Sequence, residues 1–278
     1  MKLVADEVEL FYETSGNGIP LMLMHGGMGP DHTYFRPWFD ALGDVASLIY
    51  YDHRSGGRSS RVESFDGISH DTLTADADRL RAYLGYEQMV LLGHSYGGML
   101  ALEYALRYPE HLAGLILCCT APAWDYDAEL VENSEARGTP EILAARDALH
   151  VLPLPSDEVF GDLWDRIQPL YFHRPHPAEM QAMHEKMAYS ASAYHLSEIL
   201  LADFNLDDRL PEIQTPTLIV VGADDWVTPM SQAIRMQRQL PNATTLVFKE
   251  SGHYPFIEEH EKFTSSVGAW LRQLPPSK

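Results

Sequence analysis

The stretch VLLGHSYGGMLALEYAL, Val90 to Leu106, decides the fold because its character changes halfway along. An apolar run without alternation ends at Gly93, and from Tyr96 onward apolar residues recur at helical spacing. Ser95 lies between the two, with a glycine two residues away on either side. Side chains at positions 93 and 97 would clash where a strand turns sharply into a helix, so glycine fits there. The stretch therefore predicts a buried strand, a tight turn that exposes one serine hydroxyl, and a helix.

The same alternation of strand and helix continues on both sides of this stretch. Apolar runs without alternation, separated by helices, indicate a mostly parallel sheet that is covered on both faces. The sequence thus predicts an α/β fold with helices on both faces of a central sheet. The predicted strands are residues 8–14, 21–27, 46–52, 88–93, 112–119, 217–222 and 243–248, and the predicted helices are 71–85, 96–108, 230–240 and 260–274.

The alternation of strands and helices stops between about residues 122 and 210, where little of the sequence is typical of a strand. Helical pieces such as TPEILAARDAL and PAEMQAMHEKMAY occur there with prolines between them. We interpret residues 122–210 as a helical cap inserted over one edge of the sheet. Residues 1–121 and 211–278 are then the core domain.

A catalytic serine needs a base and an orienting carboxylate, because its free hydroxyl is a poor nucleophile. His253 is the favoured base, since it lies in the loop directly after the last predicted strand. That loop opens on the same edge of the sheet as Ser95. Asp224 and Asp225 follow another strand, and residues near a strand end alternate in direction, so only one of them can face the histidine. We favour Asp225 and expect Asp224 to cap the turn or the helix after Pro229.

An anion that forms on a substrate oxygen needs two N–H donors. One is expected from Tyr96, the residue after the serine, at the positive end of the helix. The second is expected from the loop HGGMG, residues 25–29, with Gly27 or Met28 as the donor. We expect His25 to brace this loop by hydrogen bonding.

Composition restricts the partners. The 278 residues carry 20 Lys plus Arg against 40 Asp plus Glu, a net charge of −20, which disfavours nucleic acid and anionic membranes. The two cysteines, Cys118 and Cys119, are adjacent and are expected to be free, buried residues. The N-terminus has no apolar stretch of signal length, and no run approaches a membrane span. We therefore expect a cytoplasmic protein that acts on a small molecule, with an oligomeric state the sequence leaves open.

Several segments together resemble the proline iminopeptidase group of the α/β hydrolases. They are GHSYGGMLALEYALRYPEHLAGLIL, HGGMG, YYDHRSGGRSS, VGADDWVTP and ESGHYPFIEEHEKF. The resemblance implies a Ser95–Asp225–His253 triad, an acyl-enzyme mechanism and no cofactor. Two positions depart from the family pattern: Met28 stands where the aminopeptidases usually have proline, and Tyr96 where they commonly have tryptophan. These departures leave the substrate class open, since the family shares its core with esterases, lactonases and amidases.

The cap offers two kinds of substrate contact. Its aromatic and Met residues either pack the helices or form an apolar pocket over Ser95. The resemblance implies that an aminopeptidase would also hold a free amine with acidic cap residues. The substrate-binding candidates are Trp124, Trp164, Tyr171, Glu179, Glu185, Tyr194 and Glu198, with Asp203 as a further acidic candidate.

Other readings fit the sequence less well. The histidines of HRPHP, residues 173–177, and His184 match no strong metal motif, so we expect no metal site. A non-catalytic receptor on the same fold would usually lack a triad member, and a dehalogenase would need a carboxylate at position 95. The main hypothesis is a serine hydrolase of small esters or amides with an apolar acyl group, and the alternative is a carboxylesterase or lactonase without aminopeptidase activity.

Overall fold

The computed structural model describes residues 1–5 and 8–275. Residues 6–7 and 276–278, which fall in the predicted core domain, lie outside the described residues. One sheet runs through the molecule in the order β1-β2-β4-β3-β5-β6-β7-β8. Strands β3 to β8 are parallel, while β2 is antiparallel to both β1 and β4. The predicted α/β-hydrolase fold is confirmed. The strands are β1 Lys2–Ala5, β2 Val8–Gly16, β3 Ile19–Met24, β4 Ala46–Tyr51, β5 Met89–His94, β6 Leu112–Cys118, β7 Thr217–Gly222 and β8 Ala243–Phe248.

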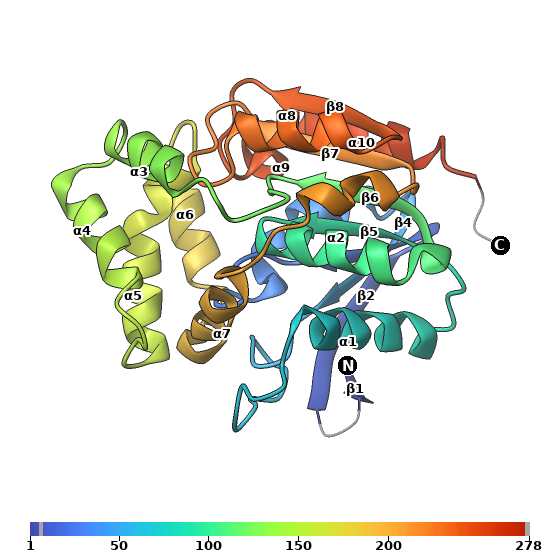
Figure 1. Ribbon diagram of the computed structural model, residues 1–278, viewed down its shortest axis with the longest axis horizontal. Helices are drawn as coiled ribbons and strands as arrows, with labels where there is room; N and C mark the ends of the chain where they lie inside the picture. Colours follow the sequence, from blue (N-terminus) through green and yellow to red (C-terminus); the bar gives the residue numbers. More distant parts are fainter. Residues whose placement is uncertain (6–7, 276–278) are drawn as a thin grey trace.

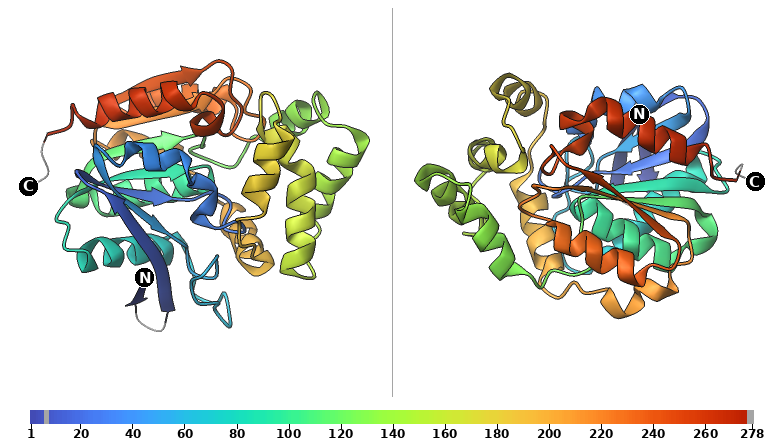
Figure 2. Two further views of the ribbon diagram at one scale, coloured as in Figure 1. Left: turned by 180° about the vertical axis from the view of Figure 1, so that it is seen from behind. Right: turned by 90° about the horizontal axis from the view of Figure 1, so that it is seen from above.

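Helices cover both faces of this sheet (Figures 1 and 2). The central strands are buried on both sides, so their residues alternate between two apolar cores. In β3, Met22 and Met24 face one core while Leu21 and Leu23 face the other. The first core is closed by α1 His70–Tyr83, α2 Tyr96–Arg107 and α8 Met230–Gln239, and the second by η1 His32–Phe35, η2 Trp38–Leu42, α9 Pro255–Glu258 and α10 His260–Leu271.

The connection between β6 and β7 consists of helices that lie together at one end of the sheet (Figure 1). They are α3 Asp127–Glu135, α4 Pro140–Leu149, α5 Asp157–Ile167, α6 Pro177–His184 and α7 Ala191–Leu201. The 3₁₀ turn η4 Gln168–Tyr171 lies among them. A further turn, η5 Asp207–Glu212, spans the predicted boundary at residue 210, and Leu210 is fully buried in the first core. The exact domain limits therefore stay a prediction.

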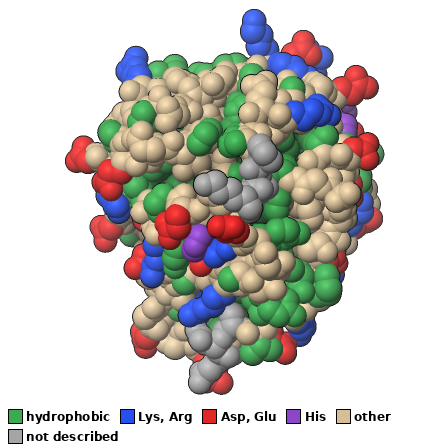
Figure 3. Space-filling model, turned by 90° about the vertical axis from the view of Figure 1, so that its right-hand side faces the viewer, with side chains coloured by type: hydrophobic (Ala, Val, Ile, Leu, Met, Phe, Trp, Pro, Cys, Tyr) green, Lys and Arg blue, Asp and Glu red, His purple; other side chains and the backbone are tan. Residues whose placement is uncertain are grey.

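The surface carries charged side chains of both signs. The face in Figure 3 carries acidic and basic side chains interspersed around apolar ones. Within the described part of the chain, every helix is too short or too polar to cross a membrane. Both cysteines are free and buried, as predicted from the sequence.

Candidate active site

Ser95 occupies a strained turn between β5, which ends at His94, and α2, which begins at Tyr96. Its backbone has φ 56° and ψ −127°, a conformation that non-glycine residues rarely adopt and that costs about 1–3 kcal/mol. The two glycines make the turn sterically feasible. A Cβ on Gly93 would lie 2.2 Å from the Gly97 carbonyl oxygen, and a Cβ on Gly97 would lie 2.2 Å from the Met24 carbonyl oxygen.

Three hydrogen bonds hold the Ser95 backbone in this conformation. Its N–H donates to the Cys118 carbonyl at the end of β6, at 3.0 Å. Its carbonyl accepts from the Gly98 N–H at 2.8 Å and from the Thr120 hydroxyl at 2.7 Å. Both polar groups of the Ser95 backbone are thereby satisfied, and the side chain remains at the wall of a cavity.

His253 lies in the loop after β8 and also lines this cavity. Its Nδ1 is 2.8 Å from Oδ2 of Asp225. Its backbone is fixed on both sides, because its N–H donates to the Tyr171 carbonyl of the cap at 2.7 Å and its carbonyl contacts Nε2 of His94 at 2.9 Å. Gly252 permits the approach of the cap, since a Cβ there would be 2.5 Å from the Tyr171 oxygen.

Asp225 is buried and held by more than the histidine. Its Oδ1 accepts hydrogen bonds from the N–H groups of Val227 and Thr228, each at 3.0 Å. Its Oδ2 accepts a hydrogen bond from the Thr228 hydroxyl at 2.7 Å. Burial opposes ionisation, but His253 and these hydrogen bonds outweigh it and hold the pKa of Asp225 below its usual 3.8. The carboxylate is therefore charged at neutral pH and accepts a hydrogen from Nδ1 of His253.

Asp224 points elsewhere. Its carboxylate pairs with the His173 imidazole of the cap, and its backbone carbonyl accepts from Arg137. The expectation that Asp224 caps the turn is wrong, because Asp225 itself accepts the N–H groups of that turn. Asp224 instead ties the cap to the loop after β7.

The loop after β3 offers one N–H to the cavity. Gly27 lines the cavity beside Tyr96, whereas Met28 is fully buried and does not line it. The Gly26 N–H is already used, because it donates to the Tyr34 hydroxyl at 2.7 Å. In the described part of the chain, the N–H groups of Gly27 and Tyr96 donate to no protein acceptor. Of the two predicted donors in this loop, the geometry therefore favours Gly27.

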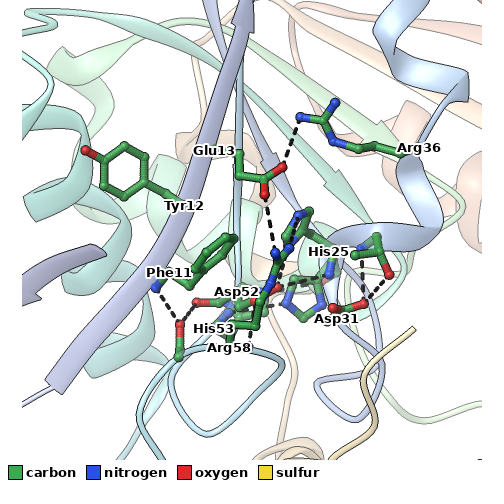
Figure 4. A network of polar contacts seen from close by, with 12 residues as sticks. Phe11, Tyr12, Glu13, His25, Asp31, Arg36, Asp52, His53 and Arg58 are labelled. Atoms are coloured by element: carbon green, nitrogen blue, oxygen red, sulfur yellow. Dashed lines mark hydrogen bonds and ion pairs between the residues drawn. The ribbon is translucent and has the colours of Figure 1, made fainter. Parts of the chain in front are cut away.

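Buried imidazoles brace the loop, and Figure 4 shows them within a larger polar network. His25 contacts the Gly26 carbonyl through Nδ1 at 3.1 Å and accepts the His53 N–H through Nε2 at 3.2 Å. The ring of His53 in turn contacts the His25 carbonyl at 3.1 Å. Burial lowers the pKa of His53 to about 4, so its ring is neutral at neutral pH. The bracing role expected of His25 is present in these contacts.

The next layer of this network contains the carboxylate of Asp52. It lies 2.5 Å from Nδ1 of His32 and accepts the Arg58 N–H at 2.9 Å. Burial alone would raise its pKa, but His32 and the other donors lower it to about 2. The guanidinium of Arg58 lies over the Phe11 ring and contacts Glu13 (Figure 4). Loop 25–29 is thus supported by a satisfied polar network, which limits its movement.

The cavity over Ser95 has a volume of about 320 Å³ and mostly apolar walls. Five of the predicted substrate-binding residues line it, namely Trp124, Trp164, Tyr171, Tyr194 and Glu198. Other lining residues were not assigned a role from the sequence. No motif covers Tyr34, Leu130, Leu149, Ile167 and Leu201, while the quoted segments contain His94, Met99, Trp226 and Val227 without marking them as pocket residues. Among the cap methionines, Met187 also lines the cavity.

The acidic candidates separate into two groups. Glu198 lines the cavity, with its side chain 25% exposed, and lies 3.7 Å from Nδ1 of His150. Glu179, Glu185 and Asp203 do not line it, so the expectation that Glu179 and Glu185 reach the substrate does not fit this geometry. Helix α6 contributes none of its residues to the cavity, because its buried residues Met180 and Met183 also lie outside the lining; Glu179 is half-buried, and Glu185, just after the helix, is exposed.

Comparisons with known proteins agree with this geometry. Residues 19–260 match the family model described as alpha/beta hydrolase fold. A proline iminopeptidase of Lactiplantibacillus plantarum is 30% identical over 276 residues, which cover 93% of this chain and 94% of the relative. A proline iminopeptidase of Clostridium botulinum is 29% identical over 279 residues, covering 94% and 92% of the two chains.

Solved structures give the same result. An esterase from Exiguobacterium antarcticum is similar with a TM-score of 0.75 and 25% identity, covering 96% of this chain and 97% of the other. A proline iminopeptidase from Mycobacterium smegmatis has a TM-score of 0.78 at 23% identity, covering 98% and 97%. The family match and the relatives together show that this chain is a hydrolase and belongs to the α/β-hydrolase fold family.

Proposed function

We propose that the chain is a cofactor-independent serine hydrolase that forms an acyl-enzyme on Ser95, with His253 as the base and Asp225 as its orienting carboxylate. The observation that carries this proposal is the 2.8 Å contact between His253 Nδ1 and Asp225 Oδ2 beside a cavity that Ser95 also lines. Because Nδ1 donates to the carboxylate, Nε2 is left as the proton acceptor.

In the first step, Nε2 of His253 takes the hydroxyl proton while Oγ of Ser95 attacks the substrate carbonyl carbon. The carbonyl π electrons move to oxygen, and the resulting anion accepts hydrogen bonds from the N–H groups of Tyr96 and Gly27. The tetrahedral intermediate then collapses, and the leaving group departs with the proton from His253. Water repeats the sequence on the acyl-enzyme and releases the acid. The N-terminal end of α2 favours the negative charge at this position.

The walls of the cavity support an apolar acyl or leaving group. Aromatic and aliphatic side chains from the cap and from the loop after β7 surround the space above Ser95. Desolvating an apolar group there is favourable by about 25 cal/mol per Å² of buried surface. A small ester, lactone or amide fits a cavity of about 320 Å³. The negative charge of the chain disfavours anionic substrates and nucleic acid.

Glu198 supports a proline-type aminopeptidase as the activity. A buried ammonium needs a carboxylate partner, and of the four acidic residues considered for that role only Glu198 lines the cavity. Burial raises the pKa of Tyr194, another residue that lines the cavity, and the nearby Glu198 carboxylate raises it further. The proline iminopeptidase relatives favour the same substrate, an amide whose acyl side carries a free secondary amine.

The alternative activity is that of a carboxylesterase or lactonase. Its support is the pairing of Glu198 with His150, which partly neutralises the carboxylate that an amine would need. The mostly apolar wall and the esterase neighbour favour it as well. The cytoplasmic location expected from the sequence stays a prediction.

A side-by-side substrate panel tests these alternatives. Purified protein is assayed on L-prolyl-p-nitroanilide, its N-acetyl derivative, p-nitrophenyl butyrate and a γ-lactone, each with the Ser95→Ala variant as control. The aminopeptidase predicts cleavage of the free-amine arylamide, loss of that cleavage on acetylation, and a selective loss in Glu198→Gln. Ester or lactone hydrolysis without arylamide cleavage would leave the esterase or lactonase. Turnover of every substrate by Ser95→Ala at the parent rate would end the serine mechanism.

A further inference from the structure

Two buried side chains lie between the loop that carries the proposed base and the loop that carries a proposed oxyanion donor. His94 is the last residue of β5, directly before Ser95, and is 2% exposed. Tyr34 belongs to η1 and is 4% exposed. Neither residue has a role in the reaction steps described above. Both line the same cavity as Ser95 and His253.

A chain of three hydrogen bonds passes through these side chains. The Gly26 N–H donates to the Tyr34 hydroxyl oxygen at 2.7 Å. That hydroxyl is 2.8 Å from Nδ1 of His94, and Nε2 of His94 is 2.9 Å from the carbonyl oxygen of His253. The chain therefore begins beside the proposed donor Gly27 and ends on the backbone of the proposed base.

The direction of every proton in this chain is fixed by its two ends. A backbone N–H can only donate and a carbonyl oxygen can only accept. The His253 carbonyl accepts from Nε2 of His94, so Nε2 carries the ring hydrogen. Nδ1 of the neutral ring then accepts the Tyr34 hydroxyl hydrogen, while the Tyr34 oxygen accepts the hydrogen of Gly26. Burial, aided by the nearby His253, lowers the pKa of His94 well below 6.5 and keeps this ring neutral.

We propose that Tyr34 and His94 are positioning residues that fix the distance and orientation of the base loop relative to the oxyanion loop. The inference rests on the proposed function, since it assigns meaning to the two loops that the chain joins. Both elements must hold their places to within fractions of an ångström for the reaction to proceed. The bonded path meets one loop next to the oxyanion donor and the other at the base itself.

If Tyr34 acted only by packing its aromatic ring, removing its hydroxyl should have little effect. The rings of Tyr254 and Phe256 lie 6.1 Å and 6.2 Å from the Tyr34 ring, and these contacts survive the loss of the hydroxyl. In Tyr34→Phe only the bonded path is cut. The Gly26 N–H and Nδ1 of His94 lose their partners, while Nε2 of His94 keeps its hydrogen bond to the His253 carbonyl. Hydrogen bonds then no longer tie the loop of Gly26 to the His94 ring, so the proposed donor Gly27 can shift relative to the base loop.

The expected loss is in kcat. Removing an oxyanion donor outright lowers kcat by about 10²–10³, and a displaced donor should have a smaller effect. We therefore expect Tyr34→Phe to lower kcat by about 10- to 100-fold with KM changed less than about threefold. His94→Leu should lose at least as much. His94→Gln should recover most of the activity, because its amide can accept from Tyr34 and donate to His253.

Tyr104→Phe is the matched control. It also removes a buried tyrosine hydroxyl, which donates to Asp78 at 2.7 Å, but Tyr104 lies on α2 and does not line the cavity. Because its partner is charged, its loss of stability should be at least as large as that of Tyr34→Phe, which we expect at about 1 kcal/mol, an about fivefold fall in the folding equilibrium constant. Its kcat should stay within about twofold of the parent.

The experiment measures kcat and KM on p-nitrophenyl butyrate, the inhibition constant of a trifluoromethyl ketone, and the melting temperature of each variant. The ketone reports oxyanion binding, because its adduct carries the anion. Support requires that its inhibition constant rises in Tyr34→Phe in parallel with the fall in kcat/KM, and that His94→Gln reverses much of the effect. Parent-like kcat in both Tyr34→Phe and His94→Leu would overturn the inference, as would an equal loss in Tyr104→Phe or a change confined to KM. Ser95→Ala in the same series separates the two proposals, since its inactivity supports the proposed function whatever Tyr34 does.

Discussion

Replacing Asp225 by asparagine tests the proposed triad at its most constrained point. The side chain has a fixed orientation, because Oδ1 accepts two backbone N–H groups, those of Val227 and Thr228, at 3.0 Å each. An asparagine must keep its oxygen at that position to satisfy both donors. Its NH₂ group then occupies the position of Oδ2, 2.8 Å from Nδ1 of His253.

This exchange reverses one hydrogen bond. The NH₂ group donates to Nδ1, so the imidazole must carry its hydrogen on Nε2, where it cannot accept the Ser95 proton. The loss of the same tautomer control in another serine hydrolase lowers kcat by about 10⁴. We expect a similar fall here, equivalent to about 5 kcal/mol of transition-state stabilisation. KM should change little, since Asp225 does not line the substrate cavity.

Asp224→Asn is the control for this prediction. Its carboxylate is 46% exposed and pairs with His173, so its loss should change kcat by less than about threefold. Both variants are assayed with p-nitrophenyl butyrate at neutral pH, after melting curves establish that they fold. A fall smaller than tenfold in Asp225→Asn, or a larger fall in Asp224→Asn, would refute the assignment of the acid.

Three further changes have expected outcomes. Gly97→Ala should unfold the protein or abolish turnover, because its Cβ would lie 2.2 Å from a carbonyl oxygen. Gly268→Ala, whose Cβ would lie 3.7 Å from the nearest atom, should raise the melting temperature slightly. Equal melting temperatures of the two variants would contradict this. His53 has a pKa of about 4 when folded against 6.5 when unfolded, so the unfolded state binds the proton first and stability should fall by about 3 kcal/mol between pH 6.5 and 4. The free energy of unfolding, measured with urea across that pH range, should depend less on pH in His53→Gln than in the parent. An unchanged pH dependence would argue against the buried neutral ring. His150→Gln should lower KM for L-prolyl-p-nitroanilide about two- to fivefold, because Glu198 loses its pairing with the imidazole. KM for p-nitrophenyl butyrate should stay constant. Equal changes in KM for both substrates would contradict a role for Glu198 in binding the amine.

The parts of the site that sequence predicts are those that parallel strands bring together. Ser95, His253 and the aspartate pair each follow a strand, and the carboxyl ends of parallel strands meet at one edge of a sheet. Topology alone therefore places these residues near one another. The choice between Asp224 and Asp225 depends on the direction of two side chains in a tight turn, and the alternation argument favoured the one that the geometry brings to His253.

The cap is where sequence reasoning reaches its limit. Glu179 and Glu185 were candidates by composition alone, and only the placement of α6 in the folded cap shows that neither lines the cavity. The short first strand, β1 Lys2–Ala5, was also missed, because four residues at a sheet edge carry almost no periodic signal.

The path from Gly26 through Tyr34 and His94 to His253 has no sequence signature. Its successive members are 8, 60 and 159 positions apart and come from two loops, a 3₁₀ turn and the end of a strand, so no periodic pattern connects them. Such a path depends on tertiary distances below 3 Å, which only the assembled fold defines.

The central claim is that Ser95 is the nucleophile, and covalent labelling tests it most directly. The native protein is treated with a fluorophosphonate, digested, and mapped by mass spectrometry, with Ser95→Ala and Asp225→Asn treated in parallel. We expect one phosphonylated residue, Ser95, with labelling absent in Ser95→Ala and much slower in Asp225→Asn. Labelling of a different residue at the rate of activity loss, or undiminished labelling of Ser95→Ala, would contradict it.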